Sequence, residues 1–562
     1  MTRDKVTLCE RSLLVLLLLP SMAIQCGPRA SSLVAPYVDV DSSTVDPPDP
    51  SEEPTGQYRS IDGTGNHLIY FEAGAANTPL TRLVASEDYD DGIGSMAGVA
   101  RPSAREISNA VCAETQTTAN ALGATDFLWQ WGQFLDHDID LTKAQEPAEP
   151  APILVPTGDA WFDPASSGLE TIDFNRSVYH HGTGYSVYPR QQLNQITHYI
   201  DGSNVYGSDD LRAAALRTND GTGRLLVSAG DLLPFNTAGL PNAGGTGPEL
   251  FLAGDVRANE QVALAALHTL FVREHNRLAQ EIAAGDPSLT GEQIYQEARR
   301  IVGALMQVIT YNDFLPALLG PNALRPYPGY RSDRSPAISN EFSTAIYRYG
   351  HSALSPTLLR LDAALTPIPE GNLPLRDAFF RPDRIVNEGG IEPLLRGLAS
   401  QACSAVDTEL VDDVRNFLFG PPGAGGFDLA ALNIQRGRDH GLSSYNVTRQ
   451  IMGLAPRADF SEVSADPDVQ ARLASVYADV EDIDLWVGAL AEDPFNGGHV
   501  GELAFTVIRH QFEGLRNCDR YWYQLIFAPA EVADLESTTL ADVIRRNTSI
   551  GAEISDDVFH ID

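Results

Sequence analysis

The 562-residue sequence carries 75 acidic and 39 basic side chains, which gives it a formal net charge of −36 at pH 7. A surface this acidic repels phosphate backbones and anionic membranes, so nucleic acid is excluded as an expected partner. Hydrophobic residues make up 43% of the chain and charged residues 20%, proportions that are typical of a folded globular protein.

The first 57 residues contain two segments that we expect to lie outside the folded domain. Basic residues precede the apolar run SLLVLLLLPSMAI, which is short and interrupted by Pro20, so residues 1–26 fit a signal peptide better than a membrane span. Residues 27–57 are rich in Pro, Ser and Asp, a composition that predicts a flexible linker. We expect no later membrane span, and therefore a secreted protein, extracellular or periplasmic, with one folded domain over residues 58–562.

Cysteine usage limits the metal chemistry that the chain can carry. The sequence has no CxxC pair, so a cysteine-rich zinc site is not expected. Of the five cysteines, Cys9 is expected to be removed with the signal peptide, and the other four are far apart in the sequence. These four could form two disulfides in three connectivities, or none: Cys26, Cys112, Cys403 and Cys518.

Long helical patterns dominate the chain after residue 57, and alternating strand patterns are scarce. The pattern predicts a single, mainly α domain of about 500 residues with little β-structure. Apolar residues recur at helical spacing over four stretches, 127–138, 259–284, 290–316 and 501–516. In the second of these, His268 and His275 are too far apart to chelate one metal ion together, so we predict structural roles for both.

The stretch FLWQWGQFLDHDIDLT, residues 127–142, places acidic residues and a histidine beside the apolar residues of a buried helix. In a helix, Gln133 and His137 share one face because they are four residues apart. Asp136 and Asp138 then point about 100° to either side of His137. One turn could therefore hold an imidazole over a pocket and direct two carboxylates at two different targets. The alternative is an N-cap or a solvated acidic turn.

The stretch THYIDGSNVYGS, residues 197–208, offers oxygen ligands of the kind that calcium prefers. In an extended loop alternate residues face the same side, which would gather two hydroxyls, a carbonyl and a carboxylate from Thr197, Tyr199, Asp201 and Ser203. Asp138 could add a second carboxylate. The alternative is a polar turn that Asp and Ser side chains stabilise.

Three later segments carry further candidate groups. In AGDVRANEQVAL, Arg257 and Glu260 lie three residues apart at the start of a predicted helix, where a surface ion pair is the simpler explanation. In YRYGHSALSP, His351 could be an ordinary buried core histidine. In LNIQRGRDHGLSSYN, residues 432–446, a structural polar network would explain the crowding of Asn433, Arg436, Arg438, Asp439 and His440.

Taken in order along the chain, these segments resemble those of the animal haem peroxidase family, which includes peroxidasin-like and myeloperoxidase-like proteins. The resemblance extends from Tyr58 to Asp562 and also covers YRSIDGTGNH, RLVASEDYDDG, HTLFVREHNRLA, IDLWVGAL and RNCDRYWY. It implies a single large haem peroxidase domain with the haem in a central helical core. The low cysteine count and the preference for arginine over lysine point to a bacterial secreted member.

The resemblance implies a role for each candidate residue. His137 is the expected base on the distal side of the haem, Arg257 the distal arginine, and Gln133 a hydrogen-bonding partner of small ligands. His351 is the expected iron ligand, and Asn433 is expected to accept a hydrogen bond from its second ring nitrogen. Two carboxylates are expected to form ester bonds to haem methyl groups and two arginines to pair with the propionates: Asp136, Glu260, Arg348 and Arg436. The expected calcium ligands are Asp138, Thr197, Tyr199 through its backbone, Asp201 and Ser203.

The expected cofactors are therefore haem b, ester-linked through two carboxylates, and calcium. The resemblance implies that hydrogen peroxide converts the haem to an oxyferryl state, which oxidises halides, pseudohalides, phenols or other small organic donors. Gln261 stands where myeloperoxidase has a methionine that forms a sulfonium link to haem, so that link is not expected here. The expected partners are hydrogen peroxide and small anionic or aromatic reductants, and the sequence leaves the oligomeric state open.

Two other functions on the same fold are kept as alternatives. A fatty-acid dioxygenase of the cyclo-oxygenase type would have a radical-forming tyrosine three residues before the axial histidine. This chain has Arg348 at that position, between Tyr347 and Tyr349. A non-catalytic extracellular adhesion module would be expected to have lost one of the two site histidines or the distal arginine, and all three are present.

Overall fold

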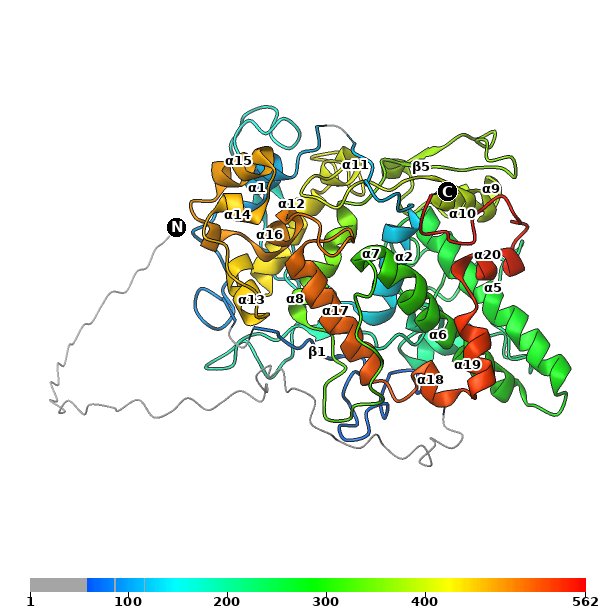
Figure 1. The fold of residues 1–562 in the computed structure, drawn as a ribbon. Coiled ribbons are helices and arrows are strands. Elements are labelled where there is room, and N and C mark those ends of the chain that lie inside the picture. The colour runs from blue at the N-terminus through cyan, green and yellow to red at the C-terminus, as the bar shows by residue number, and fades with distance from the viewer. Residues whose placement is uncertain (1–57, 85–86, 116, 562) are drawn as a thin grey trace, which may run out of the picture. The chain divides into compact units, whose positions relative to one another are not determined.

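The computed structural model describes residues 58–84, 87–115 and 117–561, and this part of the chain is mainly helical (Figure 1). Its strands form three antiparallel pairs of two residues each: β1 (Thr78–Pro79) with β4 (Leu193–Asn194), β2 (Ile153–Leu154) with β3 (Thr171–Ile172), and β5 (Thr357–Leu358) with β6 (Leu373–Pro374). The prediction of a mainly α fold with little β-structure is confirmed. The expected signal peptide and linker, with Cys9 and Cys26, lie outside the described residues.

One continuous hydrophobic core runs through the described residues, from Leu80 to Phe559. Long helices supply much of it, and many short helices surround them. The short elements are α1 (Ala104–Val111), α3 (Ser203–Tyr206), α4 (Asp210–Ala215), α8 (Asn340–Thr344), η2 (Ile346–His351), η3 (Leu375–Asp377), α9 (Asp383–Asn387), α10 (Glu392–Ser400), α11 (Asp412–Arg415), α12 (Leu429–Asp439), α13 (Tyr445–Ile451), α14 (Phe460–Val463), α15 (Pro467–Val476), η4 (Val480–Asp482), α16 (Leu485–Ala491), α18 (Tyr523–Ile526), α19 (Pro529–Glu536) and α20 (Leu540–Asn547).

Three predicted helices are found close to their predicted bounds, as α2 (Phe127–Ile139), α5 (Val262–Gly285) and α17 (Glu502–Asn517). The start of α5 differs from the prediction because Gln261 is its N-cap and accepts a hydrogen bond from the backbone of Ala263. Arg257 and Glu260 therefore lie in a turn before the helix, and the expectation that they occupy its start was wrong. The turn is closed by the backbone N–H of Glu260, which donates to the carbonyl of Arg257 at 2.8 Å.

The predicted helix over 290–316 is built from three pieces. Thr290 caps α6 (Gly291–Ile309) in a capping box with Gln293. The chain then widens into the π-helical turn η1 (Thr310–Phe314) and continues as α7 (Leu315–Leu319). Pro316 explains the widening, because it has no N–H for the helix ladder and its ring crowds the carbonyl of the preceding turn.

The same run, Gly291–Leu319, is long and apolar enough to cross a membrane by length and composition, with a mean hydropathy of 1.3 over its most apolar window. The expectation that no stretch after the N-terminus meets these criteria was therefore wrong. In the structure 78% of that window is buried inside the protein. Burial by protein is what a core helix of a globular domain requires, so length and composition alone do not indicate a span.

Helix α2 occupies the core, where it is in contact with α3, α5, α10 and η2 (Figure 1). Of its 13 residues, 11 are buried. The ring of Phe271 on α5 lies 5.2 Å from that of Phe134 and 5.7 Å from that of Trp131, so aromatic packing fixes α2 against α5. This packing places the polar C-terminal turn of α2 in a buried setting.

The cysteines of the described residues are unpaired. Cys112, Cys403 and Cys518 are all buried and carry free thiols, and no disulfide forms among them. The sequence left open two disulfides or none, and among the described residues the structure has none. The hydrophobic core, not covalent linkage, holds the described residues together.

Candidate active site

His137 lies near the C-terminal end of α2, and only 3% of its side chain is exposed. Its Nδ1 is 3.7 Å from Oδ1 of Asp255, and its Nε2 is 3.8 Å from Oε2 of Glu260. Both distances exceed a hydrogen bond, and within the described part of the chain Nδ1 has no hydrogen-bond partner. Burial, reinforced by the charge of Arg257, lowers the pKa of His137 well below its usual value. The imidazole is therefore neutral at pH 7 and able to accept a proton.

Arg257 is held beside His137 by a set of oxygen acceptors. Its Nε and Nη2 donate to the two carboxylate oxygens of Asp255 at 2.8 and 3.0 Å, and its Nη1 donates to Asp136 at 3.2 Å. Its Nη2 also donates to the backbone carbonyl of Asp140 at 2.8 Å. Burial lowers the pKa of Arg257, but the charge and hydrogen bonds of Asp255, together with the charges of Asp136 and Glu260, outweigh this effect and raise the pKa overall. The guanidinium stays positive in a buried position.

Two of the predicted carboxylates lie at the same place. Gln133 donates from Nε2 to Oε2 of Glu260 at 3.2 Å and accepts at Oε1 from Gln261, also at 3.2 Å. Burial, partly opposed by Arg257, raises the pKa of Glu260 to about 7. Burial and a neighbouring carboxylate raise the pKa of Asp136 well above its usual value. The structure thus gathers Gln133, Asp136, Glu260, His137 and Arg257 into one cluster, as the sequence predicted.

His351 ends η2, and its Nδ1 lies 2.8 Å from the amide nitrogen of Asn433 on α12. The predicted pair is therefore brought together, but its polarity differs from the prediction. The amide oxygen of Asn433 accepts from Arg348 at 3.2 Å, so the N–H, not the oxygen, faces the imidazole. A half-turn of the amide exchanges the two atoms. Burial lowers the pKa of His351 to about 3, so its ring is neutral, and Nε2 is the ring nitrogen left for a metal.

The two arginines expected at the propionates are both near Asn433: Arg348 donates a hydrogen bond to it, and Arg436 follows it by three residues on α12. Arg348 donates from Nε to the carbonyl of Ser343 at 3.1 Å. Arg436 donates from Nη1 to Oγ of Ser177 at 2.8 Å. Burial and the charge of Arg348 contribute to lowering the pKa of Arg436 to about 10, which shows that the two cations lie near one another.

The residues predicted to bind calcium meet around Asp138, which is fully buried. The loop is bent, not extended as predicted, and Ser203 already begins α3. Backbone N–H groups of the loop donate to the Asp138 carboxylate, Oγ of Ser203 donates to its carbonyl at 2.8 Å, and Oγ1 of Thr197 donates to Asp201 at 3.0 Å. The hydroxyl of Tyr199 points away to Ala73, which leaves only its backbone for a cation.

Two buried carboxylates, those of Asp138 and Asp201, lie at this loop. Burial and the charge of Asp201 raise the pKa of Asp138 to about 8. Burial likewise raises the pKa of Asp201. Among the described residues no group of three or more His, Cys, Asp and Glu side chains gathers as a metal site, so a cation here would need carbonyl and hydroxyl ligands as well. Such a mixed oxygen set is one that calcium accepts.

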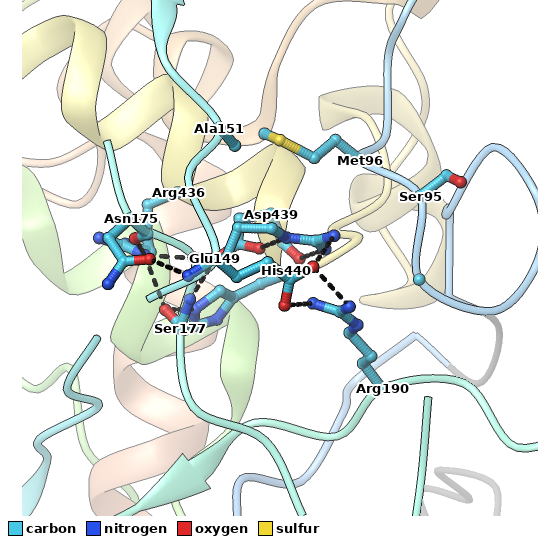
Figure 2. Close-up of polar contacts among 12 residues, drawn as sticks. Ser95, Met96, Glu149, Ala151, Asn175, Ser177, Arg190, Arg436, Asp439 and His440 are labelled. Atoms are coloured by element: carbon cyan, nitrogen blue, oxygen red, sulfur yellow. Dashed lines mark hydrogen bonds and ion pairs between the residues drawn. The ribbon is translucent and has the colours of Figure 1, made fainter. Parts of the chain in front are cut away.

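The crowded segment at the end of α12 forms a paired network (Figure 2). Asp439 accepts from Nε of Arg176 at 2.5 Å, and both ring nitrogens of His440 have partners, Ser177 at 2.7 Å and Asn340 at 2.7 Å. Arg438 is held by Asp484 on the neighbouring segment. The structural explanation of this segment therefore holds for Arg438, Asp439 and His440.

Sequence reasoning missed two buried acids and the position of one histidine. Asp255 accepts from the backbone N–H of Arg257 at 2.8 Å, an Asx-turn spacing that could have marked it. Asp140 has an Oδ2 without a partner among the described residues. His268, predicted to be structural, has its ring centroid 6.5 Å from that of His137, whereas His275 is tied to Tyr206 and a backbone carbonyl.

Comparison with known proteins agrees with this arrangement. The model of the family described as animal haem peroxidase matches residues 58–559. Peroxidasin of Drosophila melanogaster is 36% identical over 540 residues, which cover 87% of this chain and 35% of the relative. Peroxinectin A of Dictyostelium discoideum is 34% identical over 522 residues, 90% of this chain and 96% of the relative. The chain thus spans about a third of the length of the peroxidasins that it matches.

Solved structures give the same result for the fold. Peroxidase A from Dictyostelium discoideum superposes with a TM-score of 0.83 at 34% identity and covers 90% of this chain and 99% of its own. A fatty acid alpha-dioxygenase from Arabidopsis thaliana reaches a TM-score of 0.75 at 22% identity, over 91% of this chain and 84% of its own, which shows a shared fold alone. The match over nearly all of the described residues shows that the chain belongs to the animal haem peroxidase family.

Proposed function

We propose that this chain is a haem peroxidase that uses hydrogen peroxide to oxidise small donors. The observation that carries the proposal is the pairing of a buried, neutral His137 with a largely buried, charged Arg257. A neutral imidazole can move a proton, and a fixed cation can stabilise the negative charge that develops on a departing oxygen. The family membership of the chain supports the same function.

The residues fit a haem on the observations available from the chain itself. His351 is buried and neutral, and its Nε2 is the ring nitrogen not engaged by Asn433. Binding iron there requires the proton on Nδ1, which a half-turn of the Asn433 amide would satisfy while releasing Arg348 toward a propionate. When bound, haem supplies an iron centre at which the O–O bond of peroxide is cleaved and from which donors are oxidised.

His137 would then transfer a proton, and Arg257 would stabilise negative charge. Nε2 of His137 would take the proton from the peroxide oxygen nearer the iron and return it to the peroxide oxygen farther from the iron, which leaves as water. Arg257 stabilises the farther oxygen while that proton is in transit. Gln133, held between Glu260 and Gln261, offers a hydrogen bond to small ligands in the same pocket.

Asp136 and Glu260 are proposed to form ester bonds to the haem. Both side chains are partly buried at the cluster and both carboxyls have raised pKa values, so they remain there without full charge. Acid-acetone extraction after peroxide cycling should leave haem on the wild-type chain and release more of it from Asp136→Ala combined with Glu260→Ala. Free release of haem from the wild type would contradict the ester assignment.

Calcium is proposed to bind between Asp138 and Asp201. Burial raises the pKa of both carboxyls, and the charge of Asp201 adds to the shift at Asp138, which a divalent cation between them would offset. Because Asp138 follows His137 directly in α2, a cation there would also fix the turn that carries the imidazole.

The donors are proposed to be halides, pseudohalides, phenols or other small organic molecules, and the protein to be secreted. Similarity to peroxidasin and peroxinectin supports this range. Arg348, not a tyrosine, lies three residues before His351, so the fatty-acid dioxygenase alternative gains no support beyond the shared fold.

The test is a steady-state comparison of donors with the haem-reconstituted chain. Bromide, iodide, thiocyanate, chloride and a phenol are compared at several pH values, with and without peroxide. Peroxide-dependent oxidation of at least one donor supports the proposal, and His351→Ala serves as the control that should lose it. Absence of peroxide-dependent turnover with haem bound, or oxygen uptake with a polyunsaturated fatty acid without peroxide, would refute it.

A further inference from the structure

Asp255 lies between the two groups to which the proposed function assigns the peroxide chemistry. Its side chain is buried, with 1% exposed. Oδ1 accepts from both the backbone N–H and Nε of Arg257 at 2.8 Å, and Oδ2 accepts from Nη2 at 3.0 Å. The same Oδ1 is 3.7 Å from Nδ1 of His137. One carboxylate therefore adjoins both the base and the cation.

A carboxylate oxygen of Asp255 lies near Nδ1 of His137, and the neighbouring imidazole of His268 has a defined tautomer. Nδ1 of His268 lies 3.1 Å from the carbonyl of Asn204, and because a carbonyl can only accept, the proton of His268 is on Nδ1. Its Nε2 is then an acceptor, and this atom is buried without a partner in the described part of the chain. The rings of His137 and His268 have centroids 6.5 Å apart. The carboxylate of Asp255, 3.7 Å from Nδ1 of His137, favours an N–H, not a lone pair, at that nitrogen.

We propose that Asp255 is a positioning residue that keeps the proton of neutral His137 on Nδ1 and at the same time fixes the direction of Arg257. The inference rests on the proposed function, since it concerns how the base and the cation of that function are held. With Nδ1 protonated, the lone pair of His137 lies on Nε2, the nitrogen that faces Glu260. Without this selection the imidazole would divide between two tautomers, and one of them cannot accept a proton at Nε2.

The charge state of Asp255 supports this role. Burial raises its pKa, but the charge of Arg257 and the hydrogen bonds that Arg257 donates together outweigh burial and hold the pKa well below its usual range. Glu260, on the other side of the ring, has a pKa raised to about 7. Asp255 is thus the ionised acceptor over a wide pH range. Its backbone N–H donates to the carbonyl of Asn204 at 3.0 Å, and Nδ2 of Asn204 donates to the carbonyl of Phe134 at 2.7 Å, which ties Asp255 to α2.

The simpler explanation is a buried ion pair that only stabilises the fold, and the chain offers a matched control for it. Asp484 accepts from Nε and Nη2 of Arg438 at 3.0 and 2.8 Å, the same two-pronged geometry as Asp255 with Arg257. Its side chain is 7% exposed. Asp484 belongs to the paired network near α12, outside the distal cluster. Removing its charge should cost stability without touching His137.

The experiment uses the full chain loaded with haem and measures the association rate of cyanide with the ferric protein by stopped flow. Cyanide arrives as HCN, whose proton a base must take, so the rate reports the distal base without turnover. Asp255→Asn should slow association about 10- to 100-fold, within the usual contribution of a positioned base. Asp255→Glu should recover part of the rate, and Asp484→Asn should lower the melting temperature but keep the wild-type rate. A wild-type rate in haem-loaded Asp255→Asn would overturn the inference.

A second measurement on the unmodified chain keeps the inference testable if Asp255→Asn fails to fold. Imidazole nitrogens labelled with ¹⁵N report the tautomer of each histidine in the diamagnetic ferrous carbon-monoxide form, and loss of a signal in His137→Gln assigns the one of interest. A proton on Nδ1 agrees with the inference, and a proton on Nε2 contradicts it. If the wild type binds no haem or does not react with peroxide, the proposed function fails. If the wild type binds haem and reacts with peroxide, but Asp255→Asn has the wild-type rate of cyanide association, only this inference fails.

Discussion

Two buried clusters of this chain are built from the same residue types but differ in how completely they are paired. At the end of α12 (Figure 2), Asp439 is bound by Arg176, and both ring nitrogens of His440 have partners. At the end of α2, Nδ1 of His137 and Oδ2 of Asp140 have no partner within the described residues. The α12 cluster therefore pairs its acidic, basic and imidazole groups with one another, whereas the α2 cluster leaves some of these groups unpaired.

The difference separates a structural network from a chemical site. A buried polar group without a partner costs on the order of 1–3 kcal/mol, so a core that is only structural satisfies such groups. The α2 cluster leaves them unpaired and shifts their pKa values, as sites that act on ligands commonly do. Histidine and aspartate in a buried segment thus indicate function only when the surrounding chain leaves them unsatisfied.

Removing the two histidines should show the largest contrast. His137→Ala should slow the reaction of haem-loaded protein with peroxide by about 10²- to 10⁴-fold, the usual contribution of a general base. His440→Ala should mainly lower stability, because it removes a paired group from a core network. Stopped-flow rates and thermal melting of both variants give the comparison. Equal effects of the two substitutions on the peroxide reaction would erase the distinction between the clusters.

Neutralising one acid in each cluster should separate their effects on stability. Asp439→Asn leaves Arg176 with a buried, weakened partner and should reduce the free energy of unfolding by about 3–5 kcal/mol. Asp140→Asn should change it little, because burial already raises the pKa of that carboxyl. Urea unfolding at pH 7 measures both. A loss in Asp140→Asn as large as that in Asp439→Asn would show that both acids are ionised and paired.

Removal of calcium should loosen the α2 cluster and leave the α12 cluster as it is. A cation present at a hundred times its Kd stabilises the folded state by about 2.7 kcal/mol. Treatment with a chelator should therefore lower the melting temperature, and added calcium should restore it. In Asp201→Ala the chelator should have no further effect, whereas Asp439→Asn should respond like the wild type. A wild-type chain that is indifferent to both chelator and calcium would remove the cation from the proposal.

The smallest effect expected is a pH dependence that belongs to the paired cluster. Burial, with Arg436 adding to it, lowers the pKa of His440 well below 6.5. The unfolded chain therefore binds a proton that the folded chain does not, and stability falls as pH drops below about 6.5, by about 1.4 kcal/mol per pH unit for each such histidine. His440→Gln should reduce the slope between pH 6 and 5 by that amount, measured by urea unfolding. An unchanged slope would mean that His440 titrates normally in the fold.

The spacing of apolar residues predicted the long helices well. It did not predict the points at which a single residue starts or interrupts a helix. The apolar period located α2 to within a residue, because its aromatic residues are buried on nearly every side. The start of α5 was missed because the side chain of Gln261 caps it, and the break after α6 was missed because Pro316 requires a wider turn. Both effects depend on single residues that an average over many positions does not register.

The candidate site was predicted residue by residue through resemblance, whereas its fine geometry depends on contacts made by distant segments. The orientation of the Asn433 amide is set by Arg348, which lies 85 residues earlier. The place of Asp255 beside His137 follows from the packing of the turn before α5 against α2, and no local pattern encodes it. Sequence therefore supplied the members of the site, and the fold supplied their pairing.

The most direct test of the central claim is an absorption titration of the full chain with haemin, wild type against His351→Ala. The claim is that His351 is the protein ligand of a haem iron, with His137 acting on the opposite side. The wild type should bind one haem and give the Soret band of a histidine-ligated iron, and His351→Ala should lose that spectrum. A wild-type chain that stays colourless, or a His351→Ala chain with the wild-type spectrum, would contradict the claim.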